Sequence, residues 1–363
     1  MSTDDPPPTS CYTLYMKVGL VGFARAGKST IFNALTGLSA AVGGFEKKPE
    51  TSIAVVWVPD PRVDALAEIV HPERKKYAEV TFLDFPPPAE RKTALETETL
   101  VQMRETEALA QVVRAFDDPL AATPPDPVRD LRAFLTELLL ADLAVIEKRL
   151  ERLKKEKGKE RERDLLEKCQ KILEAEKPLR GVPFLPEEQV MLSGFAFLSQ
   201  KPLLIVYNLA ERALRDPLPR AVSEYATSER LTVVPICGNV EMEISQLDEA
   251  ERGAFLADLG LQDSARDRFI QCTYALLNLM SFFTAGPMEA RAWTITRGTT
   301  AVKAASKIHS DIERGFIRAE VIAYEEYIRY RGEAGCRDAG KMRLEGKEYV
   351  MQDGDVVHFR FKV

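Results

Sequence analysis

Short apolar runs alternate with stretches of helical spacing along much of the chain. Each run ends at a glycine, a proline or a polar residue, which is typical of buried strands. The runs cover residues 17–22, 53–58, 80–84, 109–116, 202–208 and 231–236. The segments 28–36 and 63–70 have the spacing of helices, and Gly37 ends the first of them. Strands that alternate with helices predict an α/β fold, a doubly wound domain with a mostly parallel sheet.

A long apolar stripe interrupts this alternation. Leucines and isoleucines recur at three- and four-residue steps from Leu131 to Leu153, which predicts one helix of about 25–30 residues. Gly158 permits a turn, and a second stripe runs from Leu165 to Leu173. Because the strand pattern resumes after this stripe, we expect an antiparallel helical hairpin inserted within the α/β domain.

The pattern of hydrophobic and polar residues changes again near residue 279, where short alternating runs and glycine turns begin. A final strand is expected at 356–361, within a small separate α+β domain. The expected division is a loose tail 1–15, the α/β domain 16–127 and 186–278, the helical insertion 128–185 and the C-terminal domain 279–363.

Composition narrows the class of protein. The 363 residues are 45% hydrophobic and carry a net charge of −6, which gives no chain-wide nucleic-acid signature. No apolar run is long enough to cross a bilayer, and the first fifteen residues lack the features of a signal peptide. The five cysteines lack CxxC spacing, which favours reduced thiols in the cytoplasm over a zinc site or disulfides. Met16 is a second candidate start of the chain.

Residues 22–29 read GFARAGKS and fit the phosphate-binding pattern GxxxxGK[ST]. A phosphate chain needs many hydrogen-bond donors at close range. Glycines let the backbone curl so that successive N–H groups point inward, and the positive N-terminal end of the following helix adds to the attraction. Lys28 would reach the β- and γ-phosphates, and the Ser29 hydroxyl would bind Mg²⁺. A chance glycine turn is the alternative. The predicted nucleotide-binding residues of this loop are Arg25, Ala26, Gly27, Lys28, Ser29 and Thr30.

Asp84 ends a predicted buried strand downstream of this loop. A carboxylate in that position is the expected second anchor for Mg²⁺, through water. The alternative is an Asp that merely occupies a turn at the strand end. The predicted metal-binding residues are therefore Ser29 and Asp84.

Two further strand ends carry candidate contacts to the base. Asn208-Leu209-Ala210-Glu211 stands where GTPases of this general class have Asn-Lys-x-Asp, whose Asp binds guanine. Glu211 in place of that Asp makes strict guanine selection doubtful, although Asn208 and Glu211 could also start a helix. Cys237, Gly238 and Asn239 follow the last strand and either contact the base or form an ordinary turn.

Nearly the whole chain from Met16 resembles the YchF/Obg-like ATPase family of P-loop proteins. The segments that carry the resemblance are KVGLVG (17–22), GKSTIFNALT (27–36), VPDPRVDALAEIV (58–70), MRETEAL (103–109), VVRAFDD (112–118), NLAE (208–211), NLMSFFTAG (278–286), RAWTI (291–295), IHSDIERGFIRAEVIAYEEY (308–327) and GKMRLEGKEYVMQDGDVVHFRF (340–361). The last four resemble the family's TGS domain.

The resemblance implies a G domain interrupted by a helical hairpin and followed by a TGS domain. It also implies binding of ATP in preference to, or alongside, GTP, with Mg²⁺, slow hydrolysis and association with ribosomes or RNA. We expect a monomeric cytoplasmic protein that has no membrane partner.

The chain departs from the family pattern at both switch segments. The family has Asp-x-x-Gly after the strand-end Asp, whereas Pro87 stands here and has no N–H to donate to a γ-phosphate. Aligning back from 58–62 places Lys48 where the family has a Mg²⁺-binding Thr, and an alternative alignment would recruit Thr51. We therefore expect a diverged member that binds nucleotide with weak or absent hydrolysis.

Two classes of function remain open on the sequence. One is a nucleotide-stabilised binding module with little turnover, and the other is a slow ATPase or GTPase that regulates a ribosome-linked step or a stress response. A metabolic kinase that uses the same phosphate loop is less favoured, because the C-terminal resemblance is extensive, although phosphorylation of a small acceptor would support it. The hairpin tip, 147–168, holds ten Lys/Arg and seven Asp/Glu, which suits a solvated helix face as well as an RNA contact.

Overall fold

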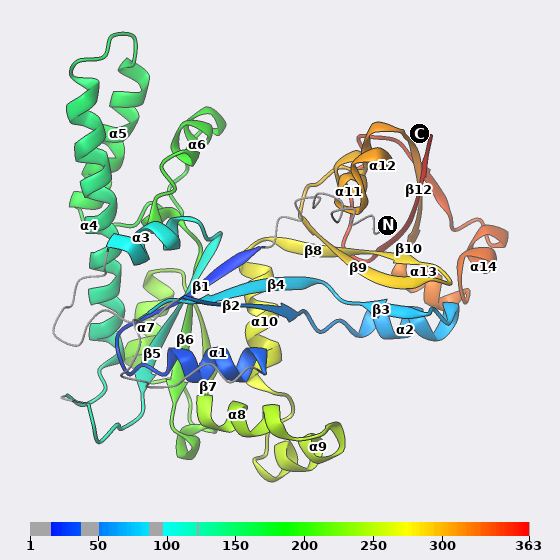
Figure 1. Cartoon of the computed structure of the whole chain (residues 1–363), viewed down its shortest axis with the longest axis horizontal. Helices are drawn as coiled ribbons and strands as arrows, with labels where there is room; N and C mark the ends of the chain where they lie inside the picture. The colour runs from blue at the N-terminus through cyan, green and yellow to red at the C-terminus, as the bar shows by residue number, and fades with distance from the viewer. Residues whose placement is uncertain (1–15, 38–50, 87–96, 122, 363) are drawn as a thin grey trace, which may run out of the picture. The chain divides into compact units, whose positions relative to one another are not determined.

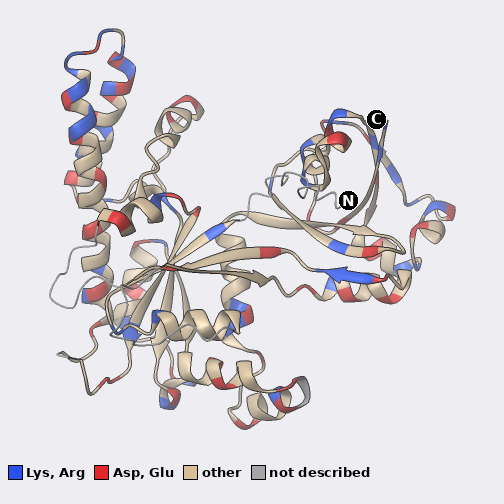
Figure 2. Cartoon of the chain, in the orientation of Figure 1, with Lys and Arg blue, Asp and Glu red and all other residues tan. Residues whose placement is uncertain are grey.

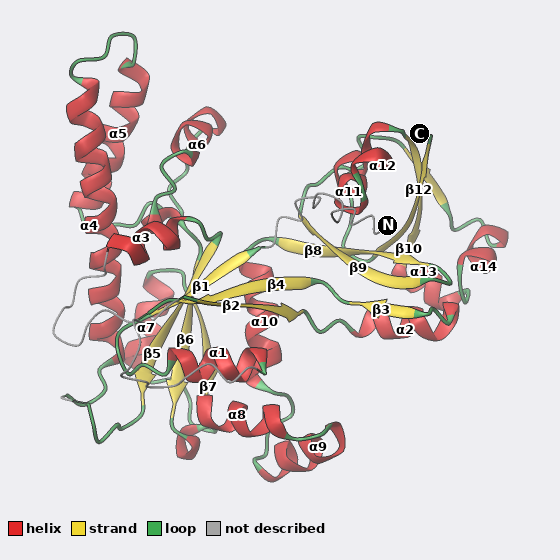
Figure 3. Cartoon of the chain, in the orientation of Figure 1, coloured by secondary structure: helices red, strands yellow, loops and turns green. Residues whose placement is uncertain are grey.

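The computed structural model describes residues 16–37, 51–86, 97–121 and 123–362 (Figure 1). Their contacts form two compact units. The larger unit comprises Lys17–Val56 and Thr81–Leu276, and the smaller unit is built from Trp57–Val80 and Leu277–Val363. Each unit is organised around a six-stranded sheet (Figure 3).

The sheet of the larger unit has the order β2-β4-β1-β5-β6-β7. Its strands are β1 (Lys17–Val21), β2 (Ser52–Trp57), β4 (Glu79–Asp84), β5 (Ala108–Ala115), β6 (Leu203–Leu209) and β7 (Thr232–Ile236). β1 pairs in parallel with both β4 and β5, and β5, β6 and β7 continue the parallel arrangement. Every apolar run that predicted a strand of this sheet is one, so the predicted α/β fold is confirmed.

Helices cover both faces of this sheet. Leu131 of α4 (Pro127–Leu153) and Ala226 of α7 (Arg220–Ser228) pack on Val113 and Ile205. Phe269 of α10 (Ala265–Leu276) contacts Phe82 on β4, with ring centroids 5.4 Å apart. The parallel registers and the alternation of side chains place Phe82 on the face opposite Val113, so the sheet lies between two helical layers.

Shorter helices complete the larger unit. They are α1 (Lys28–Thr36), α3 (Thr97–Arg104), α6 (Pro186–Ser193), α8 (Gly238–Gln246), α9 (Glu249–Asp258) and the 3₁₀ turns η1 (Leu198–Gln200) and η2 (Glu211–Ala213). α1 ends as the sequence predicts, because Gly37 adopts φ 68° and its N–H donates to the Asn33 carbonyl.

The predicted hairpin consists of α4 (Pro127–Leu153) and α5 (Glu160–Glu174). Asp126 caps α4 by accepting from the Arg129 N–H, and Pro127 occupies the first turn. The two apolar stripes meet in one buried core. The tip carries both signs of charge (Figure 2), and Arg149 pairs there with Glu156 and Glu162. Among the described residues, no helix has the length and apolarity needed to span a membrane.

The sheet of the smaller unit has the order β11-β10-β12-β8-β9-β3. Its strands are β3 (Arg74–Lys76), β8 (Leu279–Ala285), β9 (Glu289–Thr296), β10 (Phe316–Ala323), β11 (Arg343–Glu345) and β12 (Asp355–Phe361), and its helices are α2 (Pro61–Val70), α11 (Ala301–Ile308), α12 (Ser310–Arg314), α13 (Tyr324–Arg329) and α14 (Glu333–Asp338). The alanines of α11 pack closely against Phe282 and Phe359 in its core.

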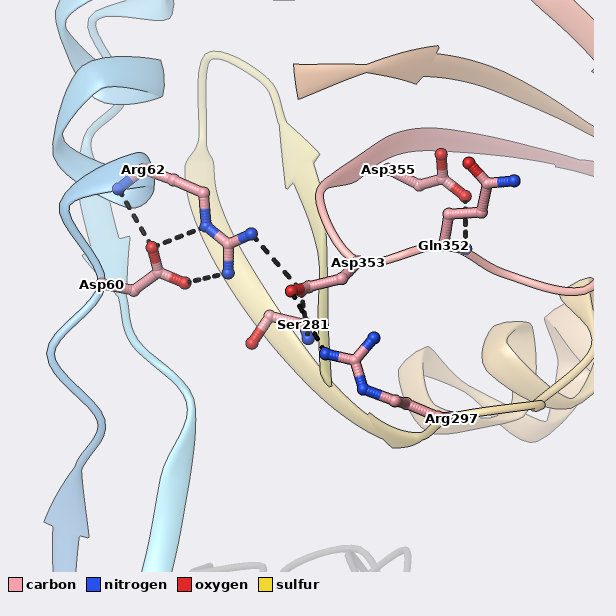
Figure 4. Close-up of polar contacts among 7 residues, drawn as sticks. All are labelled: Asp60, Arg62, Ser281, Arg297, Gln352, Asp353 and Asp355. Atoms are coloured by element: carbon pink, nitrogen blue, oxygen red, sulfur yellow. Dashed lines mark hydrogen bonds and ion pairs between the residues drawn. The ribbon is translucent and has the colours of Figure 1, made fainter. Parts of the chain in front are cut away.

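The segment Trp57–Val80 belongs to the smaller unit, whereas the sequence pattern suggested that it continues the α/β domain. β3 pairs in parallel with β9, and Arg62 at the start of α2 pairs with Asp60 and with Asp353 (Figure 4). The sequence did not indicate β3, because its three residues are Arg-Lys-Lys and exposed, so they carry no apolar alternation.

Candidate functional site

The turn between β1 and α1 requires glycine at two positions. Gly22 has φ 142°, and a Cβ there would lie 2.4 Å from the Val112 carbonyl oxygen. Gly27 has φ 87°, and a Cβ there would lie 2.2 Å from Nδ2 of Asn208. A side chain would clash at both positions. The spacing of the glycines in the motif therefore reflects the close packing of this loop against β5 and β6.

Lys28 is buried beneath this loop. Its Nζ donates to the Gly22 carbonyl at 3.1 Å and to the Phe23 carbonyl at 3.4 Å. Burial lowers the pKa of Lys28 to about 8, although the charge of Asp84 opposes the shift. Neither of these two acceptors of the Lys28 ammonium is a carboxylate. An anion in the loop would supply the missing negative charge.

Ser29 and Asp84 come together as predicted. The Ser29 hydroxyl donates to Oδ2 of Asp84 at 2.8 Å, although the residues are 55 positions apart. Within the described part of the chain, the other oxygen, Oδ1, is buried and accepts no hydrogen bond. Burial raises the pKa of Asp84, against the opposing effects of Ser29 and Lys28. A buried oxygen donor without a partner, beside a hydroxyl, suits a hard cation such as Mg²⁺.

Asn208 joins the phosphate loop to the last strand-end loop. Its Nδ2 donates to the Ala26 carbonyl at 2.9 Å, and its Oδ1 accepts from the Gly238 N–H at 3.1 Å. The side chain is almost fully buried. Both ends of the amide are therefore used within the protein, and Asn208 braces the site rather than presenting its side chain to a base.

A cleft of about 400 Å³ opens where these loops meet. Its lining residues come from the ends of β5, β6 and β7 and from the phosphate loop: Gly27, Thr30, Phe116, Asp117, Asn208, Leu209, Ala210, Glu211, Arg212, Cys237, Gly238 and Asn239. The structure therefore gathers the predicted base-contact residues around one cavity. Grooves at the carboxyl ends of parallel strands are the usual ligand sites of such sheets.

Two predicted contact residues differ in how they face this cleft. The side chain of Leu209 packs in the core with Tyr207 and Val222, so Leu209 lines the cleft with its backbone. Glu211 begins η2 and is exposed, with its carboxylate available to donors in the cleft.

Burial raises the pKa of the Cys237 thiol, which keeps it neutral at the start of α8.

The sequence-based prediction missed four lining residues, Phe116, Asp117, Ala210 and Arg212. Phe116 and Asp117 directly follow β5, so the rule that ligands bind at the carboxyl ends of strands would have indicated them. Arg212 pairs with Asp117 at 2.8 Å, and this contact joins residues 95 positions apart. No local pattern predicts it.

The two switch substitutions, Lys48 and Pro87, lie outside the described residues. Thr51, the alternative metal ligand, is described, and its hydroxyl donates to Oε1 of Gln102 on α3 at 2.6 Å. The structure thus brings Ser29 and Asp84 together and places Thr51 against another helix.

A glycine loop between a strand and a helix, with a carboxylate at the end of the neighbouring strand in the sheet, defines the class of P-loop nucleotide-binding domains. A family model described as "50S ribosome-binding GTPase" matches residues 17–149. A model of the C-terminal domain of YchF GTPases, described as "Protein of unknown function (DUF933)", matches residues 279–362.

Similarity to individual proteins covers almost the entire chain. "Ribosome-binding ATPase YchF" of Haemophilus influenzae is 45% identical over 96% of this chain and 99% of that protein. The protein of the same name from Bacillus subtilis is 40% identical over 96% of this chain and 100% of that protein. The structure of the Schizosaccharomyces pombe YchF GTPase has a TM-score of 0.84 and 31% identity, covering 95% of this chain and 97% of the other. The chain belongs to the YchF family.

Proposed function

We propose that this protein binds a purine nucleotide together with Mg²⁺ in the larger unit, and that ATP is its preferred ligand. The observation that carries the proposal is the convergence of the phosphate loop, the Ser29–Asp84 pair and the 400 Å³ cleft at one edge of the sheet. We expect the phosphates at 25–30, the base against the loops 208–211 and 237–239 with Asn208 bracing them, and Mg²⁺ at Ser29 and Asp84.

The chain's own groups divide the work of binding. Among the described residues, Lys28 donates to carbonyls of its own loop, so it is available to move onto phosphate oxygens, and a phosphate there would raise its lowered pKa. The bound Mg²⁺ would neutralise phosphate charge. Oδ1 of Asp84 would gain a partner, directly or through water, while Ser29 would turn its hydroxyl from Asp84 to the cation.

The base preference rests on Glu211, since Asn208 is occupied by protein contacts. A carboxylate accepts hydrogen bonds, so Glu211 suits the amino group of adenine as well as the N–H groups of guanine. The name that the relatives carry, ATPase, favours ATP. GTP remains a ligand to be measured beside it.

Slow turnover is the second part of the proposal. Pro87 cannot donate an N–H to a γ-phosphate, and the alignment that places Lys48 at the metal-binding Thr position removes a ligand of Mg²⁺, so both expected sensors of the terminal phosphate are altered. We propose weak or absent hydrolysis. An active slow ATPase is the competing function, and the intact Lys28, Ser29 and Asp84 support it.

Ribosome binding in the cytoplasm is proposed from the name of the relatives. We also propose that the C-terminal domain from residue 279 is of the TGS type and that the chain acts as a monomer. If ribosomal RNA is the contact, co-sedimentation with ribosomes should weaken steeply as salt rises, because phosphate contacts release counterions.

Calorimetry of the full chain with ATP, ADP, GTP and a non-hydrolysable ATP analogue, beside an assay of phosphate release, tests the proposal. We expect Mg²⁺-dependent binding of ATP and ADP with similar affinities and little phosphate release. Strong preference for triphosphate with steady turnover would establish the slow ATPase instead. Absence of binding by every nucleotide would refute the proposed site, and Lys28→Ala provides the matched negative control.

A further inference from the structure

Arg25 projects a guanidinium from the middle of the phosphate loop. Its Nε donates to Oδ2 of Asp118 at 2.7 Å, and Nη2 donates to Oδ1 at 3.1 Å, so both carboxylate oxygens are engaged. The N–H of Leu120 also donates to Oδ1, at 3.0 Å. Arg25 and, to a smaller degree, this N–H hold the pKa of Asp118 below its usual range. Asp118 is therefore a charged, oriented partner beside the loop.

The backbone at Arg25 is unusual for its residue type. Its φ is 63°, in the left-handed region that non-glycine residues seldom adopt. Such conformations persist where the surroundings impose them and cluster at functional sites. The ion pair with Asp118 helps to fix the direction in which this side chain leaves the loop.

Two carboxylates flank the loop from opposite sides of β1. Asp84 ends β4, Asp118 follows β5, and the strand order β4-β1-β5 separates them. Ser29 contacts the first carboxylate and Arg25 the second. A phosphate chain in the loop would have the metal on the β4 side and the guanidinium of Arg25 on the β5 side.

The β5 side is also the side of the base cleft. Phe116 and Asp117, which precede Asp118 directly, line the 400 Å³ cavity. Between its base and its terminal phosphate a nucleotide carries the ribose and the inner phosphates, and the α-phosphate is the phosphate nearest the base. The guanidinium of Arg25 is thus tethered near the position where the α-phosphate enters the loop.

We propose that Arg25, which pairs with Asp118 in this structure, is an internal phosphate ligand whose guanidinium moves to the α-phosphate side of the phosphate chain when a nucleotide binds. The inference rests on the proposed function, because it requires a nucleotide in the loop. A guanidinium binds phosphate oxygens with the same forked geometry with which it binds a carboxylate. Asp118 therefore acts as a competitor that the phosphate replaces.

The test is calorimetry of the full chain with ADP and with ATP, each in Mg²⁺ and in EDTA. Arg25→Asn removes the guanidinium and keeps a residue that tolerates φ 63°. We expect it to weaken both nucleotides about tenfold, by the same factor with and without Mg²⁺. Ser29→Ala, the matched variant on the metal side, should weaken binding only in Mg²⁺. Asp118→Asn should tighten binding severalfold, because it removes the competitor.

The outcomes separate this inference from the proposed function. Wild-type affinities in Arg25→Asn would overturn the inference and leave the nucleotide site intact. A loss seen only in Mg²⁺ would place Arg25 on the metal side and also overturn it. If Asp118→Asn weakened binding as much as Arg25→Asn, Asp118 would be a support for Arg25 and the transfer would be refuted. A wild-type chain that bound no nucleotide would refute the proposed function and, with it, the role of Arg25. Hydrogen exchange of each variant verifies that it is folded.

Discussion

Replacing Arg62 by Met should loosen the segment Trp57–Val80 within the smaller unit. The guanidinium donates to Asp60 through Nε at 2.9 Å and Nη2 at 2.8 Å, and to Asp353 through Nη1 at 3.3 Å (Figure 4). It also lies 4.8 Å from the ring centroid of Phe283. Met retains an unbranched apolar stem but removes the charge and every side-chain donor.

The size of the effect follows from exposure. Breaking a buried ion pair by removing one partner costs about 3–5 kcal/mol, but the Arg62 side chain is 29% exposed and Asp60 is 9% exposed. Solvent screens part of that cost, and Asp60 keeps its bond from the Arg62 N–H. We therefore expect a loss of about 2 kcal/mol in the free energy of local opening, or roughly a thirtyfold change in the opening constant.

Amide hydrogen exchange of α2 and β3 measures this local opening directly. Arg297→Met is the matched control, because Arg297 pairs with the same Asp353 at 3.7 Å while its side chain is 54% exposed. Its effect should stay below about 0.5 kcal/mol. Exchange in Arg62→Met that remained within twofold of the wild type, or that equalled the control, would show that the Arg62 contacts do not hold α2 and β3 in place.

Three further predictions concern the larger unit. Gly27→Ala should abolish nucleotide binding in calorimetry, because its Cβ would lie 2.2 Å from Nδ2 of Asn208; retained affinity would contradict this packing. Cys169 should react with iodoacetamide at pH 8 far more slowly than the half-exposed Cys272, because burial raises its pKa to about 11; peptide mass spectrometry that found equal rates would be evidence against a closed hairpin core. Asp142→Ala should destabilise the unit by about 3 kcal/mol, because the buried carboxylate accepts from one guanidinium N–H and two backbone N–H groups; an unchanged thermal midpoint would disprove that role.

The sequence predicts those parts of this protein that are encoded locally. The sheet of the larger unit is predictable because its inner strands, β1, β4, β5 and β6, are buried on both faces and read as continuous apolar runs. α1 is predictable at both ends, since the phosphate motif starts it and Gly37 stops it. Lys28, Ser29 and Asp84 are predictable for the same reason, because a short motif and a strand end specify them.

The remaining features depend on contacts between distant residues. Asn208 braces the site through the Ala26 carbonyl, 182 positions away, so its structural use cannot be read from its neighbours. The Arg25–Asp118 pair spans 93 positions. β3 is three charged residues that become a strand only because β9 is available to pair with them. Tertiary context determined each of these outcomes.

In the proposed function, three strand-end loops and the phosphate loop form one nucleotide site. Hydrogen exchange of the full chain, with and without ATP and Mg²⁺, tests whether they do. We expect joint protection of residues 25–30, 116–118, 208–212 and 237–239. Protection confined to another region, or no change in any of these segments at saturating nucleotide, would contradict it.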